Sequence, residues 1–86
     1  MKKVWHDEAW EEYLYWQTQD KKTLRKINRL LKDIDRNGYN CTGKPEPLKY
    51  LPGYWSVRID EANRIVFKIE NGQLEILQCG SHYGDK

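Results

Sequence analysis

Residues 54–79 decide the fold, and they read YWSVRIDEANRIVFKIENGQLEILQC. Apolar and polar residues alternate along 54–59, 64–69 and 74–79, as they do in β-strands that bury one face. The Asn71-Gly72 pair between the last two segments is typical of a tight hairpin turn, because both positions accept a positive φ. A short polar segment separates the first two. The stretch therefore predicts three consecutive antiparallel strands.

The alternation also assigns each side chain to a face of this sheet. In the first strand, Trp55, Val57 and Ile59 share one face, whereas Ser56 and Arg58 share the other. We expect the apolar face to be covered by helices. The face that carries Ser56 and Arg58 would then be free to form a site.

Two helices are predicted upstream of the strands. The first covers residues 7–18, with Asp7 as the N-cap. The second follows Asp20, which can cap it, and ends at Asn37-Gly38, where a left-handed backbone is accepted. Its apolar residues keep the helical spacing of one buried stripe: Leu24, Ile27, Leu30, Leu31 and Ile34. Two consecutive helices with a short connection should pack as a hairpin.

The remaining segments complete one domain that spans residues 1–86. Residues 2–5 read as a short opening strand, and residues 39–53, which contain three prolines, read as irregular. The sequence thus predicts an α+β fold in which the helical hairpin packs on one face of an antiparallel sheet.

Charge is unevenly distributed along a chain whose formal net charge is only +2. Residues 21–58 contain ten Lys or Arg against three Asp or Glu, a balance of +7. A basic segment of this kind indicates either a face that binds polyanions or a solvated helix surface, and charge alone favours the second reading.

Composition also excludes several classes of protein. No apolar run approaches the roughly 20 residues of a membrane span, and acidic residues near the N-terminus interrupt any signal-peptide core, so a soluble cytoplasmic protein is expected. The two cysteines form no CxxC motif, and the two histidines, His6 and His82, lie at opposite ends of the chain. We therefore expect no metal site and no cofactor.

Three sets of residues could carry chemistry. Glu46 lies between Pro45 and Pro47, whose rings stiffen the loop and could hold a catalytic base in place, although an ordinary exposed Glu is the simpler reading. Arg58 and Arg64 flank one turn and could grip a phosphate together or pair with nearby carboxylates.

His82 follows the last strand and titrates near neutral pH, although a terminal His is more often an inert surface residue. Together, Glu46, the two arginines and His82 would suit RNA cleavage by the 2′-hydroxyl. That reaction needs a base, a cation for the phosphorane and an acid for the 5′-oxygen. The set is suggestive but not specific.

Several stretches, read together, resemble the YoeB (Txe) toxins of the RelE superfamily. They are Trp10, Tyr13 to Gln17, Asp20-Lys21, Ile27-Asn28, Gly43 to Lys49, Gly53 to Ser56, Arg58-Ile59, Asn63-Arg64 and His82-Tyr83. The resemblance implies a compact RelE-like fold and a ribosome-dependent endoribonuclease (mRNA interferase) that needs no metal. Such a toxin cleaves messenger RNA in the ribosomal A site, inhibits translation and is neutralised by a YefM/Phd-type antitoxin.

The resemblance also implies residue roles. Glu46 would be the general base, Arg64 would stabilise the transition state, His82 would be the general acid and Tyr83 would orient the site. Lys49 and Arg58 would contact RNA phosphate. The basic helix would face the ribosome, through Lys21, Lys22, Arg25, Lys26 and Arg29.

Two other hypotheses remain open at this point. The chain could be a catalytically weak module that binds an antitoxin and regulates its operon, or an RNA-binding domain without cleavage. The sequence also leaves open whether the chain forms a homodimer.

Overall fold

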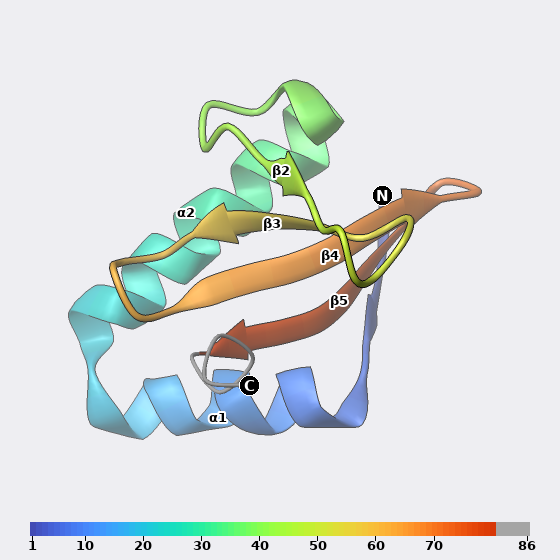
Figure 1. Cartoon of the computed structure of the whole chain (residues 1–86). Helices are drawn as coiled ribbons and strands as arrows, with labels where there is room; N and C mark the ends of the chain where they lie inside the picture. The colour runs from blue at the N-terminus through green and yellow to red at the C-terminus, as the bar shows by residue number, and fades with distance from the viewer. Residues whose placement is uncertain (81–86) are drawn as a thin grey trace.

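The computed structural model describes residues 1–80, which form two helices and a five-stranded sheet (Figure 1). The helices are α1 (Asp7–Gln19) and α2 (Lys21–Asn37), and a short 3-10 turn, η1 (Gly38–Asn40), follows them. The strands are β1 (Lys2–Trp5), β2 (Glu46–Pro47), β3 (Trp55–Arg58), β4 (Arg64–Glu70) and β5 (Gln73–Gly80). No helix in this part of the chain has the length and apolar character that a membrane span needs.

The α+β prediction is confirmed, but the sheet is mixed rather than antiparallel. Its strand order is β1-β5-β4-β3-β2, and β1 runs parallel to β5 while all other pairs are antiparallel. The parallel pair joins Lys2 to Gln73 and Trp5 to Ile76, about 70 residues apart. Nothing local in the sequence specifies such a pairing, whereas the antiparallel pairs follow directly from their short turns.

The local signals are largely confirmed. Asp20 caps α2 by accepting hydrogen bonds from the backbone N–H groups of Lys22 and Thr23. Asn71 and Gly72 both adopt positive φ in the β4–β5 turn. Two expectations were wrong: α1 begins at Asp7 with no side-chain cap, and residues 39–53, expected to be irregular, contain η1 and β2.

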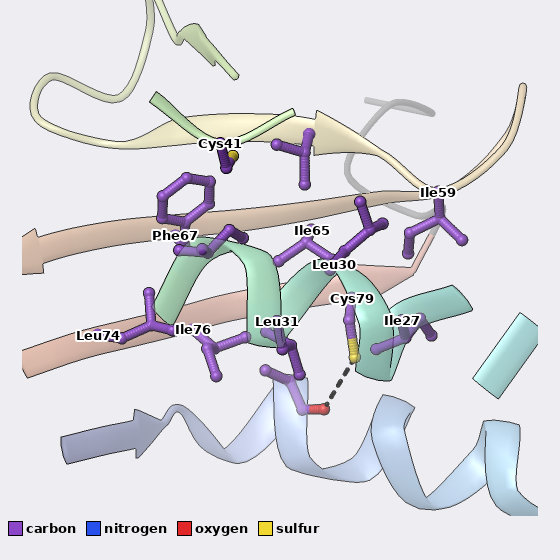
Figure 2. Packing of buried hydrophobic residues seen from close by; sticks show 13 residues of the cluster. Ile27, Leu30, Leu31, Cys41, Ile59, Ile65, Phe67, Leu74, Ile76 and Cys79 are labelled. Atoms are coloured by element: carbon purple, nitrogen blue, oxygen red, sulfur yellow. Dashed lines mark hydrogen bonds between the residues drawn. The ribbon is translucent and has the colours of Figure 1, made fainter. Parts of the chain in front are cut away.

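One hydrophobic core joins both helices to the same face of the sheet (Figure 2). The predicted stripe of α2 supplies four buried side chains, and Ala9 is the buried contact of α1. β3 and β4 supply the alternating side chains expected from the sequence, with Phe67 at the centre of β4. In β5 a register shift interrupts the alternation and places Cys79 in the core instead of Gln78. Each fully buried aliphatic or aromatic side chain contributes about 1.5–3 kcal/mol.

The opposite face is less open than the sequence predicted. Ser56, Val66 and Gln78 are cross-strand neighbours there, and their exposed fractions are only 3%, 0% and 3%. The middle of this face is therefore covered, and the space for a site lies toward β2 and the β3–β4 turn.

Candidate active site

The strand register brings the predicted base and both arginines to one face. Glu46 pairs with Ser56 across β2 and β3, and Arg58 pairs with Arg64 across β3 and β4. Side chains that are directly opposite in antiparallel strands share a face. Ser56 and Arg58 are two residues apart on one strand, so all four side chains project from the face away from the helices.

These side chains line one cavity of about 250 Å³, together with Gly43 and Lys44. The cavity is small, and four of its six lining residues have charged side chains. Arg64 is half-buried, and its Nη1 lies 3.5 Å from the Ser56 hydroxyl oxygen. Glu46 and Arg58 are exposed, so a ligand can reach both.

The loop that leads to Glu46 is held by α2. The Asp33 carboxylate accepts hydrogen bonds from the Thr42 hydroxyl at 2.6 Å and from the Thr42 backbone N–H at 2.8 Å. The Thr42 hydroxyl and the Asn37 amide lower the pKa of Asp33 below its usual value. Gly43 comes next, where a Cβ would lie only 3.3 Å from Val57, so the loop packs closely against the sheet.

A tight turn fixes the arginine pair. The Asp60 carboxylate accepts hydrogen bonds from the backbone N–H groups of Ala62 and Asn63 at 2.9 and 2.8 Å. Burial alone would raise the pKa of Asp60, but these bonds and the Asn63 amide outweigh it and hold the pKa low. Asp60 is thus engaged by its own turn.

The arginines have no acidic partner in the described part of the chain. Within residues 1–80, neither Arg58 nor Arg64 forms a salt bridge, with Asp60, Glu61 or any other carboxylate. The structure therefore does not contain the ion pair that was the alternative explanation for these residues. Two uncompensated guanidinium groups beside a cavity can bind a phosphate, because their planar donors match its oxygens.

The structure does not place Lys49, His82 or Tyr83 in this cavity. Lys49 is exposed in the β2–β3 loop and does not line the cavity. His82 and Tyr83 lie outside the described residues. The last described residue of β5, Gly80, pairs with Arg64, so β5 ends beside the arginine pair.

The basic residues of α2 border a second, larger cavity. It measures about 790 Å³ and lies between α2 and the end of β3. Lys26 and Arg29 line one side, and the floor includes Leu30 and Ile59. Arg58 and Gly43 line both this cavity and the smaller one. Lys21, Lys22 and Arg25 are exposed on the same helix.

Sequence reasoning gave no role to Lys44, whose side chain lines the smaller cavity. Its backbone has a φ of 55°, a left-handed conformation that a Lys does not signal in a sequence. The only feature of the sequence that could have indicated a role for Lys44 is its position next to Gly43.

Comparison with known proteins places the chain among bacterial toxins. It matches, over residues 5–83, the family model of the YoeB-like toxin of bacterial type II toxin-antitoxin system. It is 48% identical over 84 residues to Toxin YoeB of Escherichia coli (strain K12), an alignment that covers 96% of this chain and 100% of that protein.

Two solved structures from Staphylococcus aureus are also similar. One is a YoeB-YefM complex, matched with a TM-score of 0.88 and 42% identity, and the other is a YoeB dimer, matched with a TM-score of 0.87 and 44% identity. Each match covers 96% of this chain and 98% of the other.

Proposed function

The chain belongs to the YoeB-like toxins of bacterial type II toxin–antitoxin systems, and on this premise we propose that it is a ribosome-dependent endoribonuclease. It would cleave messenger RNA in the ribosomal A site, in the cytoplasm, and so inhibit translation. The observation that carries the proposal is the cavity that Glu46, Arg58 and Arg64 line together.

The proposed reaction uses the RNA's own 2′-hydroxyl as the nucleophile. Glu46 takes the proton of the 2′-hydroxyl, and the 2′-oxygen forms a bond to the adjacent phosphorus. The bond from phosphorus to the 5′-oxygen breaks, and His82 donates a proton to that leaving oxygen. The products are a 2′,3′-cyclic phosphate and a 5′-hydroxyl. Each acid–base role typically contributes about 10²–10⁴ in rate.

Arg64 would stabilise the charge that develops on the phosphorane, a contribution that commonly amounts to about 10²–10³ in rate. Its position supports this role, because it is half-buried in the cavity and its hydrogen-bond partner there is the neutral Ser56 hydroxyl rather than a carboxylate. Arg58 and Lys49 would bind flanking phosphates, and Tyr83 would orient the base at the cut.

The ribosome would be bound by the basic surface of α2, through Lys21, Lys22, Arg25, Lys26 and Arg29. These residues are exposed, and none of them forms a salt bridge within residues 1–80. Their charge is therefore available to ribosomal RNA. Arg58 lines both cavities and would contact an RNA strand that runs from this surface to Glu46.

We infer the partner from the relative in Staphylococcus aureus, which forms a complex with YefM. A YefM-type antitoxin would bind this chain and block its activity. A homodimer is the expected state of the free toxin, because that relative also has a dimeric form.

Induction of the chain alone in bacteria tests the proposal. We expect growth arrest, relief by a co-expressed YefM-type antitoxin, and new transcript ends within the codons of translated messages. Glu46→Gln, which keeps the shape of the side chain, is the matched control and should permit growth. Normal growth with soluble, folded wild-type protein would contradict the proposal and favour a module that only binds an antitoxin.

A further inference from the structure

Three polar groups of Cys79, near the end of β5, form hydrogen bonds to helix α1. The Trp16 indole Nε1–H donates to the Cys79 carbonyl oxygen at 2.7 Å, and the Cys79 backbone N–H donates to Glu12 Oε1 at 2.8 Å. The Cys79 thiol donates to the Ala9 carbonyl oxygen at 3.5 Å, which Figure 2 shows as a dashed line. We call Glu12 and Trp16 the clamp.

The clamp provides hydrogen-bond partners for β5 beyond the point where β1 ends. The partner strand on this side, β1, ends at Trp5, which pairs with Ile76. Beyond that point the backbone N–H and C=O groups of β5 on this edge need other partners, since unpaired buried backbone groups are costly. In a strand both groups of one residue point to the same side, and here Glu12 and Trp16 supply the acceptor and the donor for Cys79.

The next residue shows how closely α1 approaches the strand. A Cβ on Gly80 would lie 2.7 Å from Glu12 Oε2, closer than Cβ atoms approach other heavy atoms in proteins. A side chain at this position would require the Glu12 carboxylate to move. The absence of a side chain at Gly80 and the position of Glu12 are therefore linked.

We propose that Glu12 and Trp16 are positioning residues for the cleavage reaction. They hold the end of β5, where Gly80 pairs with Arg64, and they would act on the general-acid step that the proposed function assigns to His82. His82 follows Gly80 by two residues in the sequence, a reach of at most about 7 Å. A misplacement of about 1 Å can cost 10²-fold in rate. The inference rests on the proposed function.

The test uses two RNA substrates on programmed ribosomes, under single-turnover conditions. One is an ordinary RNA, and the other has sulfur in place of the 5′-oxygen at the cut. A thiolate leaves without a proton, so the second substrate does not need the general acid. His82→Gln should slow the first substrate strongly and the second little, whereas Arg64→Ala should slow both.

Trp16→Phe removes the indole donor and keeps an aromatic ring. We expect it to slow the ordinary substrate about tenfold or more and the sulfur substrate less than twofold. Trp10→Phe is the matched control, because it removes an indole N–H from an exposed part of the same helix, and it should leave both rates unchanged. Equal slowing of both substrates by Trp16→Phe, or no slowing of either, would overturn the proposal.

Glu12 and Gly80 provide an independent test that does not depend on the folding of Trp16→Phe. Glu12→Gln retains an acceptor oxygen and should keep most of the activity, whereas Glu12→Ala should lose about tenfold on the ordinary substrate only. Gly80→Ala should be similarly slow, because it displaces the Glu12 carboxylate. The double variant Glu12→Ala/Gly80→Ala should be no slower than Glu12→Ala alone. If the two rate losses multiplied in the double variant, the proposal would be overturned. If wild-type protein cleaved neither substrate, the proposed function itself would fail.

Discussion

Arg58 and Arg64 lie directly opposite each other on adjacent strands, and this arrangement predicts opposite effects of mutation on stability and on activity. Like charges at directly opposed positions destabilise a sheet. Neither arginine has a salt bridge within residues 1–80 that would offset the repulsion. Arg64→Gln should therefore cost little or no stability while it removes the cation that the reaction needs.

The size of the repulsion follows from the register. Opposed Cβ atoms lie about 5 Å apart, and flexible side chains let the two charges separate to about 7 Å. Coulomb's law then gives roughly 0.6–1.2 kcal/mol for effective dielectric constants between about 80 and 40. Screening at 0.1 M salt, where the Debye length is about 10 Å, roughly halves this energy. We expect a repulsive coupling of about 0.3–0.6 kcal/mol.

A double-mutant cycle of Arg58→Gln and Arg64→Gln measures this coupling. Urea unfolding at pH 7 should show that the double variant gains less stability than the two single changes together, and the coupling should shrink at 1 M salt. With a slope of about 1 kcal/mol per molar urea, the coupling corresponds to about 0.3–0.6 M in the midpoint. A loss of more than about 1 kcal/mol in Arg64→Gln would refute the reasoning, because it would show that Arg64 is held by a stabilising partner.

Three further outcomes are expected. Burial raises the pKa of the Cys79 thiol to about 12, so the thiol should react with Ellman's reagent only after denaturation. The unfolded thiol ionises near 9, so the stability that the buried, protonated thiol contributes should be lost as the pH rises from about 9 to about 12. Urea unfolding of Cys79→Ala should lack this part of the alkaline loss. A threonine hydroxyl and an asparagine amide lower the pKa of Asp33, so its stabilising bonds are present above its ordinary pKa of 3.8 and are lost as the pH falls through the lowered value; Asp33→Asn should be less stable at pH 7 and lose less below pH 4. Charge reversal at Lys22, Arg25 and Arg29 should weaken ribosome co-sedimentation, with steep salt dependence and an unchanged circular dichroism spectrum; unchanged co-sedimentation would exclude α2 as the docking surface.

The elements that could be predicted are those with local causes. Alternation along β3 and β4, the positive-φ pair Asn71-Gly72 and the cap at Asp20 each act within a few residues, and each is present as expected. In β5 the alternation is interrupted by a register shift, which places Cys79 in the core and Gln78 on the opposite face. The parallel β1–β5 pair could not be predicted, because it joins residues 2–5 to residues 73–76 and depends on how the whole chain packs.

The candidate site divides in the same way. Arg58 and Arg64 could be placed on one face once the turn between them was recognised, and the register bears this out. Lys44 could not be placed, because its position depends on a left-handed backbone that its residue type disfavours. Glu12 and Trp16 were also missed as positioning residues, since they act on the backbone of a strand more than 60 residues away.

The central claim is that this chain cleaves messenger RNA by acid–base chemistry on the RNA's 2′-hydroxyl, with Glu46 as base and His82 as acid. Single-turnover cleavage on programmed ribosomes with end-group analysis tests it most directly. We predict a 2′,3′-cyclic phosphate or its hydrolysed 3′-phosphate, a 5′-hydroxyl, and rate losses of about 10²-fold or more in Glu46→Gln and in His82→Gln. A 5′-phosphate product, or full activity in both variants, would contradict the claim.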